Sequence, residues 1–246
     1  MEMKQKPLAG KSILVTGSAY RLGKVMVLTA AHLGADVIIH HGHSQADAES
    51  TAAEAESLGV QARIVQADLS QPAEVERLIT AVFTETPLYG LINNAAIFPP
   101  GGLLETDLAT WQQNLAVNLT APFLLSQAFI RLHASGEPGR VINMLDWRAL
   151  RPGRDHFGYT ISKAGLAALT QACAVAGAPQ VTVNAIALGA ILPPSDGGES
   201  EAILRNVPAQ RWASINELED LCRFLLTGPE YITGEIIHLD GGRHLI

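Results

Sequence analysis

The stretch SILVTGSAYRLG, Ser12–Gly23, decides how the rest of the chain is interpreted. An apolar run rich in β-branched residues leads to Thr16, glycines follow at Gly17 and Gly23, and a helical pattern starts at Leu22. Glycines at such a turn let the backbone approach a pyrophosphate, which then sits against the free amides of a helix N-terminus. Two glycines also suit an ordinary strand–helix turn, but the strand–turn–helix context favours a dinucleotide-binding loop.

The rest of the chain alternates between short β-branched runs and longer helical patterns. We expect strands at Ser12–Thr16, Asp36–His40, Ala62–Gln66, Tyr89–Ile92, Arg140–Met144, Val181–Ala187 and Glu235–Leu239. We expect helices at about Leu22–Leu33, Ala46–Leu58, Pro72–Thr84, Thr110–His133, Tyr159–Ala176 and Ile215–Leu226. Such alternation is typical of a parallel sheet with helices on both faces. The sequence therefore predicts an α/β fold: a single doubly wound, Rossmann-type domain over residues 1–246 with a mostly parallel, seven-stranded sheet.

The composition predicts a large buried core and argues against several kinds of partner. Hydrophobic residues make up 48% of the 246 residues and charged residues 17%, which argues against disorder. The net charge of −7 offers no basic surface for nucleic acid or anionic lipid, so residues that bind an anion must be placed locally. The first ten residues lack an apolar signal core. We therefore expect a cytoplasmic protein that binds neither nucleic acid nor membrane.

Two features suggest a metal site or a membrane span, but the residues do not support either. Cys173 and Cys222 match no metal or redox spacing, so we interpret them as buried thiols and expect no metal. No charged residue occurs from Ala164 to Ser195, but Pro179 and several polar residues interrupt this stretch. A buried helix followed by a buried strand is the better interpretation.

The second expected strand leads into His40-His41-Gly42-His43-Ser44. An NAD site usually carries an acid here for the ribose 2′-hydroxyl, yet no carboxylate occurs before Asp47. His43 and Ser44 would instead donate hydrogen bonds to a 2′-phosphate, although histidines in a polar loop can also be incidental. The missing acid predicts NADPH as the cofactor.

Tyr159 and Lys163 lie one helical turn apart and share a helix face. A neighbouring ammonium favours the phenolate, so we expect Lys163 to lower the pKa of Tyr159. Such pairs are common on surface helices, but this one follows the fifth expected strand and lies downstream of the glycine loop. The two residues are therefore candidates for acid–base chemistry.

The chain resembles the short-chain dehydrogenase/reductase family over nearly its whole length, because several motifs of that family occur in the same order. The matching residues are Gly17, Ala67-Asp68-Leu69, Asn93-Asn94-Ala95, Val117-Asn118-Leu119, Tyr159, Lys163, Val183-Asn184-Ala185-Ile186, Ile232-Thr233-Gly234 and Asp240-Gly241-Gly242. The resemblance implies that Tyr159 donates a proton, that Lys163 holds the ribose and that Asn118 orders a relay water. With the loops above, the expected cofactor site comprises Gly17, Arg21, Leu22, Gly23, His43, Ser44, Asp68, Leu69, Asn94, Lys163 and Ile191. Within it, Asp68 and Leu69 would bracket adenine.

Three departures from the usual family pattern resemble its pteridine reductase branch. Arg21 replaces a common glycine, Asp146 replaces a common serine at the thirteenth position before Tyr159, and Phe98 closely follows Asn94. In that branch the arginine approaches diphosphate and pterin, the phenylalanine stacks on the pterin, and the aspartate works with the tyrosine. A π-face contributes about 0.5–1.5 kcal/mol to holding a flat ring. Reduction of a ring C=N also needs a proton on nitrogen, which a carboxyl group can relay.

Simpler interpretations of two of these residues stay open. Phe98 would suit a packed core, and Asp146 would suit the cap of a turn. Leu188 replaces the branch's usual proline, ahead of a Pro/Gly-rich segment at about 193–208 that we expect to be a substrate lid. Ligands of open α/β sheets bind beyond the strand ends, where this segment begins.

The sequence thus predicts NADPH-dependent reduction of a dihydropterin or dihydrofolate-like ring to the tetrahydro form, with Arg21, Phe98, Asp146 and Tyr159 at the substrate. A carbonyl reductase for a ketoacyl or sugar ketone is the alternative, which an ionised Asp146 would disfavour by repelling an oxyanion. A catalytically silent NADP-binding sensor is the third. No residue is charged from Trp111 to Ile130, and such a helix needs cover on several sides, as does the uncharged helix from Ala164. The resemblance places both helices at a subunit interface, so we expect a homotetramer.

Overall fold

The computed structural model describes residues 6–84, 87–134, 136–192 and 203–246. Within these residues one sheet has the strand order β3-β2-β1-β4-β5-β6-β7, and every neighbouring pair is parallel. The strands are β1 Ser12–Val15, β2 Asp36–His41, β3 Ala62–Gln66, β4 Leu88–Asn93, β5 Gly139–Asp146, β6 Val181–Leu188 and β7 Ile236–Leu239. The predicted single Rossmann-type domain is confirmed, and its sheet is wholly parallel.

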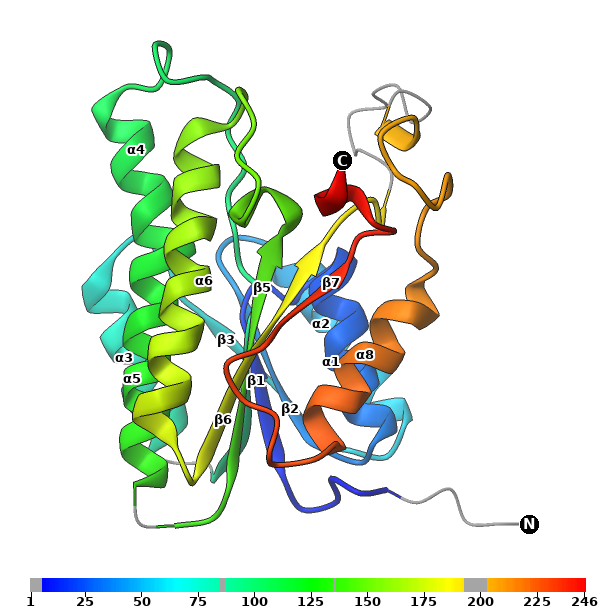
Figure 1. Ribbon diagram of the computed structural model, residues 1–246. Helices are drawn as coiled ribbons and strands as arrows, with labels where there is room; N and C mark the ends of the chain where they lie inside the picture. The colour runs from blue at the N-terminus through cyan, green and yellow to red at the C-terminus, as the bar shows by residue number, and fades with distance from the viewer. Residues whose placement is uncertain (1–5, 85–86, 135, 193–202) are drawn as a thin grey trace.

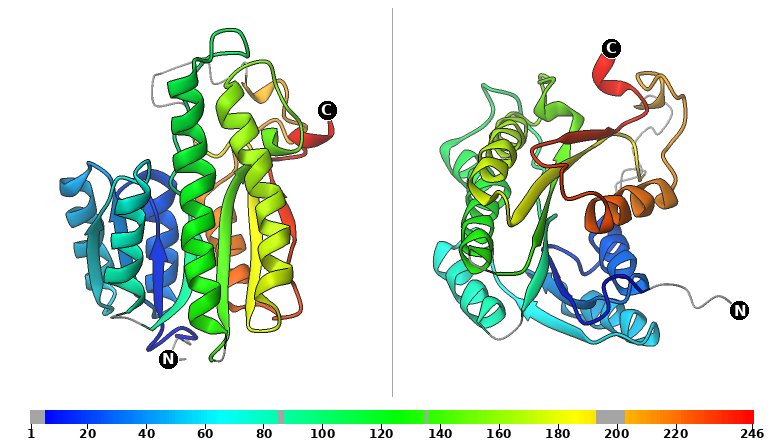
Figure 2. Two further views of the ribbon diagram at one scale, coloured as in Figure 1. Left: turned by 90° about the vertical axis from the view of Figure 1, so that its left-hand side faces the viewer. Right: turned by 60° about the horizontal axis from the view of Figure 1, so that its bottom comes forward.

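Helices cover both faces of the sheet (Figures 1 and 2). One face packs against α1 Arg21–His32, α2 Gln45–Ser57 and α8 Ile215–Thr227. The other packs against α3 Pro72–Phe83, α5 Ala121–His133 and α6 Phe157–Gly177. The helix α4 Leu108–Leu115 lies beyond the strand ends and packs on α6. The expected helix Thr110–His133 therefore forms α4 and α5, which a π-helical turn, Ala116–Thr120, joins.

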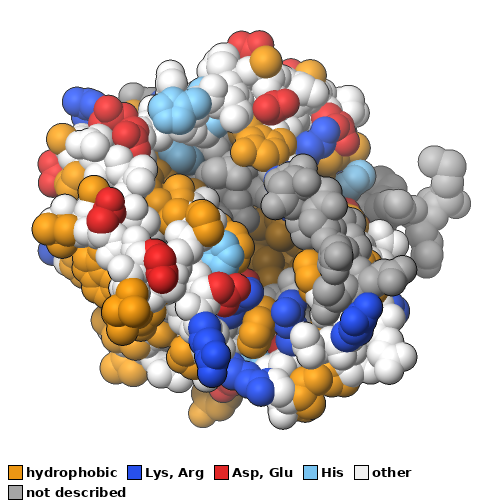
Figure 3. Space-filling model, turned by 90° about the horizontal axis from the view of Figure 1, so that it is seen from above, with side chains coloured by type: hydrophobic (Ala, Val, Ile, Leu, Met, Phe, Trp, Pro, Cys, Tyr) orange, Lys and Arg blue, Asp and Glu red, His pale blue; other side chains and the backbone are white. Residues whose placement is uncertain are grey.

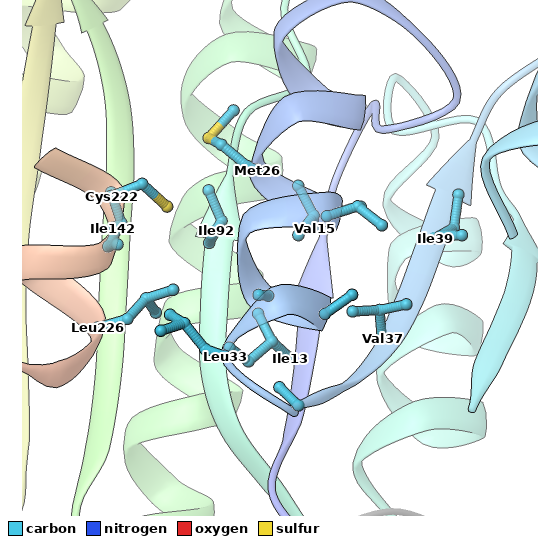
Figure 4. Packing of buried hydrophobic residues seen from close by; sticks show 14 of the residues in the cluster. Ile13, Val15, Met26, Leu33, Val37, Ile39, Ile92, Ile142, Cys222 and Leu226 are labelled. Carbon is cyan, nitrogen blue, oxygen red and sulfur yellow. The ribbon is translucent and has the colours of Figure 1, made fainter. Parts of the chain in front are cut away.

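The core beside α1 is built from the inward side chains of α1, α8 and the central strands (Figure 4). Met26 on α1 and Leu226 on α8 are fully buried there, as is Ile142 on β5. Cys222 is also fully buried, and burial raises the pKa of its thiol to about 12. Both cysteines are free and buried, as expected of structural thiols.

The sheet creates a crevice at the strand ends. β1 pairs with β2 on one side and with β4 on the other, so the chain order reverses between β1 and β4. In open α/β sheets ligands bind at this reversal, outside the carboxyl ends of the strands. These ends point to the top of Figure 1, where the glycine loop and the loop after β4 meet.

One helix, Leu108–His133, is long and apolar enough to cross a membrane by length and composition alone. In this fold its C-terminal half packs on α3 and α6 in the layer that covers the sheet, and a core helix of a soluble protein passes the same test. As far as it is described, the uncharged stretch Ala164–Ser195 forms most of α6 and all of β6. It is a helix followed by a strand and not a single long helix.

Candidate active site

The glycine loop leaves no room for a side chain at its two key positions. Gly17 has φ +59°, and a Cβ there would lie 2.8 Å from the Cα of Ala95. A Cβ on Gly23 would overlap the carbonyl oxygen of Gly17. The side-chain amide of Asn94 donates to that same oxygen at 2.8 Å. Loop, helix and β4 are thus packed backbone to backbone, which a side chain would disrupt.

A cavity of about 580 Å³ runs from this loop across the ends of β2 and β3. Its lining includes nine residues expected at the cofactor: Gly17, Arg21, Leu22, Gly23, His43, Ser44, Asp68, Leu69 and Asn94. The start of α1 lines this cavity, and the free amides of a helix N-terminus are groups that bind a pyrophosphate. These residues fit a dinucleotide. Lys163 and Ile191 do not line this cavity.

His40 supports the glycine loop. The sequence did not predict this role. Its Nδ1 accepts a hydrogen bond from the Gly17 amide at 3.0 Å, so its Nε2 carries the proton and donates to the carbonyl of Ala67 at 3.1 Å. Burial lowers the pKa of His40 to about 4, so the ring stays neutral. The available signal was its position at the end of a buried strand, where a polar ring must find partners.

A second cavity, of about 430 Å³, adjoins the first. Arg21 and Leu22 line both, and the four residues expected at the substrate, Arg21, Phe98, Asp146 and Tyr159, all line the second. Leu188 and Ile191 form part of its wall. Of the expected lid, residues 193–202 lie outside the described part, and Ile203 lines the cavity.

Asp146 and Tyr159 lie close together at the second cavity and affect each other's ionisation. Tyr159 is buried, whereas Asp146 is partly exposed. Burial raises the pKa of Asp146, although Arg148 and Lys163 partly oppose this. The Oδ1 atom of Asp146 also accepts from the backbone amide of Arg148 at 2.8 Å. Asp146 therefore caps a turn, as the simpler interpretation has it, and also contacts Tyr159.

The expected lowering of the Tyr159 pKa is wrong for this structure. Burial, with the negative Asp146 beside it, raises the Tyr159 pKa well above its ordinary value. The Lys163 ammonium instead donates to the carbonyl of Met144 at 2.7 Å and lies 5.7 Å from the Tyr159 ring centre. Burial lowers the pKa of Lys163 to about 8. Tyr159 is therefore a neutral phenol, able to donate a proton.

Phe98 is not a core residue, because 48% of it is exposed. Its ring stacks on His156 at 3.6 Å between centres and meets the Tyr159 ring edge-on at 4.5 Å. The His156 ring is held in turn, with Nδ1 2.8 Å from the carbonyl of Pro99. Phe98 therefore forms a fixed aromatic wall beside the Tyr159 ring.

Asn118 lies in the π-helical turn and is fully buried. Its side chain accepts from the Ile97 amide at 2.9 Å and donates to the Ile97 carbonyl at 3.0 Å. It also donates to the Ser162 hydroxyl at 3.1 Å. Asn118 thus ties the loop before Phe98 to α6, one residue before Lys163.

Comparison with known proteins assigns the family. A family model described as enoyl-(acyl carrier protein) reductase matches residues 17–244. A 3-oxoacyl-[acyl-carrier-protein] reductase from Synechocystis is 32% identical over 96% of this chain and 97% of its own. A 2-dehydro-3-deoxy-D-gluconate 5-dehydrogenase from Formosa agariphila is 30% identical over 95% and 92%. The chain belongs to the short-chain dehydrogenase/reductase family.

Solved structures add a more specific likeness. FolM alternative dihydrofolate reductase 1 from Brucella canis, complexed with NADP, superposes with a TM-score of 0.89. It is 34% identical, over 98% of this chain and 96% of its own. This likeness fits the pteridine reductase branch that Arg21, Phe98 and Asp146 resemble.

Proposed function

We propose that the protein is an NADPH-dependent reductase that converts a dihydropterin ring to its tetrahydro form. The observation that carries this proposal is that Asp146 and Tyr159 lie beside the partly exposed ring of Phe98 in one cavity. A flat ring fits beside such a wall, and a ring nitrogen needs the proton that the pair holds. The likeness to a dihydrofolate reductase supports the same substrate class.

The first cavity would hold the cofactor. The glycine loop and the amides of α1 would bind its phosphates, Asp68 and Leu69 its adenine, and His43 and Ser44 its 2′-phosphate. Lys163 would leave the carbonyl of Met144 to reach the ribose. When bound, NADPH supplies a hydride. Several related structures contain NADP, which supports this cofactor for the present chain.

The protein's own contribution is positioning and a proton. Tyr159 remains protonated because burial and the negative charge of Asp146 oppose its ionisation. Burial also raises the pKa of Asp146, so its carboxyl takes up a proton more readily than an ordinary aspartate does. Tyr159, or Asp146 when it is protonated, can place a proton on the ring nitrogen next to the carbon that is reduced. Arg21 reaches both cavities and supplies a permanent charge at their junction.

Reduction of a ketone is the second candidate, because two relatives are named as 3-oxoacyl-[acyl-carrier-protein] reductases. Burial raises the pKa of Asp146, and a protonated Asp146 would not repel an oxyanion as an ionised carboxylate would. Replacing Asp146 with serine separates the two candidates in one background. Pterin reduction should fall in Asp146→Ser while ketone reduction stays the same or rises. The second candidate would be favoured if the wild type reduced ketones but no pterin, and if Asp146→Ser lost the ketone reduction.

We also propose a cytoplasmic homotetramer. An apolar groove between α5 and α6 is lined by Leu119, Thr120, Phe123, Gly165, Ala168, Leu169 and Ala172. Phe123 is 41% exposed, and only 39% of the most apolar window of Leu108–His133 is buried within one chain. A second copy of the same helices would cover this surface, as the family resemblance suggests.

A further inference from the structure

The second cavity is positively charged, although the chain as a whole is negative. Its charged lining residues in the described part are Arg21, Arg148, Arg243 and Asp146, three positive and one negative. The whole chain carries a net charge of −7. From above, basic side chains gather along one margin of the hollow at this end of the molecule (Figure 3). Local positive charge in an acidic protein indicates a site for an anion.

Arg243 is held at this cavity by the chain that follows β7. The carboxylate of Asp240 accepts from the amide of Gly242 at 2.9 Å and from the amide of His244 at 2.8 Å. These bonds shape a short 3₁₀ turn, Arg243–Leu245. Arg151 donates to the carbonyl of Arg243 at 3.3 Å. The backbone of Arg243 is therefore fixed on both sides.

Among the described residues, no carboxylate forms an ion pair with the Arg243 guanidinium within 4 Å, although Asp146, Asp155 and Asp240 act on it from farther away. Its centre lies 4.3 Å from the Trp147 ring, and its buried Nε has no hydrogen-bond partner. Arg148, in contrast, forms an ion pair with Asp155 at 3.0 Å. The Arg148 guanidinium also lies over Trp147, at 4.9 Å. Two guanidinium groups thus lie against one indole ring, and within the described part of the chain only Arg148 forms an ion pair.

This arrangement costs free energy that an anion would recover. Burial and the neighbouring Arg148 lower the pKa of Arg243, and Asp146, Asp155 and Asp240 offset this only in part, so the cation is destabilised where it stands. Arg21 adjoins the cofactor cavity and the phosphates expected there, whereas Arg243 lines only the second cavity. The cofactor phosphates therefore do not account for Arg243.

We propose that Arg243 forms a subsite for a carboxylate on the side chain of the pterin substrate, so that a conjugate with an acidic tail is preferred to an uncharged pterin. The inference rests on the proposed function. The ring would lie at Phe98, Asp146 and Tyr159. Arg148 lies 5.7 Å from Phe98 and shares Trp147 with Arg243, so Arg243 stands beyond the ring site, where a tail would reach.

The test compares two substrates in matched variants. Dihydrofolate carries a glutamyl tail, and dihydrobiopterin carries an uncharged one. kcat/KM is measured for both, together with calorimetric binding of each to the protein with NADP⁺. Arg243→Gln removes the charge, Arg243→Lys keeps it, and Arg223→Gln removes an exposed arginine on α8 as a control for net charge.

In Arg243→Gln, kcat/KM for dihydrofolate and the affinity for dihydrofolate should each fall about tenfold. The change should lie mainly in KM, because the lost charge-assisted bond holds the substrate equally in the bound complex and in the transition state. Dihydrobiopterin should change less than twofold, and Arg243→Lys should retain most of the dihydrofolate preference. Equal losses for both substrates, or a wild type without preference for dihydrofolate, would overturn the subsite while leaving pterin reduction intact. Turnover of neither substrate by the wild type would instead refute the proposed function.

Discussion

Arg21 lowers the stability of the protein, and we expect that it is nevertheless needed for activity. It opens α1 with φ +52°, in the left-handed region, and its side chain is exposed. This conformation destabilises the folded state by roughly 1–2 kcal/mol for a residue with a Cβ. A cation in the first turn of a helix costs roughly 0.3–1 kcal/mol more through the helix dipole. The local structure therefore favours an uncharged glycine at this position.

Arg21→Gly should accordingly unfold at a higher denaturant concentration than the wild type. Glycine also gives the unfolded chain more conformational freedom, which lowers the free energy of unfolding by roughly 0.5–1 kcal/mol. The net increase in the free energy of unfolding is therefore about 1 kcal/mol. For a chain of this length, that corresponds to a Tm increase of about 2–4 °C. At the same time kcat/KM for a dihydropterin should fall, because the charge at the junction of the two cavities is lost.

Two variants separate the contributions to this stability change. Arg21→Ala removes the charge but keeps the strained φ, so it should gain less stability than Arg21→Gly. Gln210 also has a positive φ, +54°, and lines neither cavity, so Gln210→Gly should gain stability without loss of activity. An Arg21→Gly protein that is less stable than the wild type would refute this reasoning about strain and helix charge.

The other predictions concern cofactor, proton transfer, pH and assembly. NADPH should be preferred to NADH in kcat/KM, and Ser44→Asp should narrow the ratio by repelling the 2′-phosphate; a wild-type preference for NADH would contradict the assignment of this loop. Tyr159→Phe should lose about 10²–10⁴-fold in kcat with nearly unchanged NADPH affinity, and retention of a tenth of the activity would exclude Tyr159 as the proton donor. Pterin reduction should fall as pH rises through the Asp146 pKa, which lies above its ordinary 3.8, because the protonated carboxyl is lost, and a pH–rate profile of Asp146→Asn should lack this limb. Light scattering should give a tetramer that Phe123→Asp dissociates, and a monomeric wild type at micromolar concentration would refute the interface.

The sequence predicted the sheet well because its strands are buried runs between clear helical patterns. It placed the end of β5 at Met144, whereas the strand continues to Asp146, paired there with Leu188 of β6. An apolar run cannot reveal that a carboxylate extends a strand, since the pairing depends on a neighbour distant in sequence. The sequence offered a turn cap and a partner of the tyrosine as separate interpretations of Asp146, and the fold shows that Asp146 is both.

The electrostatics of the site were the least predictable part. The sequence places Lys163 one helical turn from Tyr159, and from that spacing alone a lowered tyrosine pKa follows. Burial of Tyr159 and the contact with Asp146 reverse the direction, and both depend on packing between α6 and β5. The role of His40 beneath the glycine loop was equally hidden, because its partners Gly17 and Ala67 lie on other segments.

We propose that the site formed by Asp146, Tyr159 and Phe98 serves the reduction of a pterin ring rather than a ketone. The most direct test is the ratio of kcat/KM for dihydrobiopterin to kcat/KM for a 3-oxoacyl thioester, measured with NADPH on the wild-type protein. We expect a ratio far above one, and a marked decrease of this ratio in Asp146→Ser. Efficient turnover of the thioester with no oxidation of NADPH in the presence of any dihydropterin would contradict it.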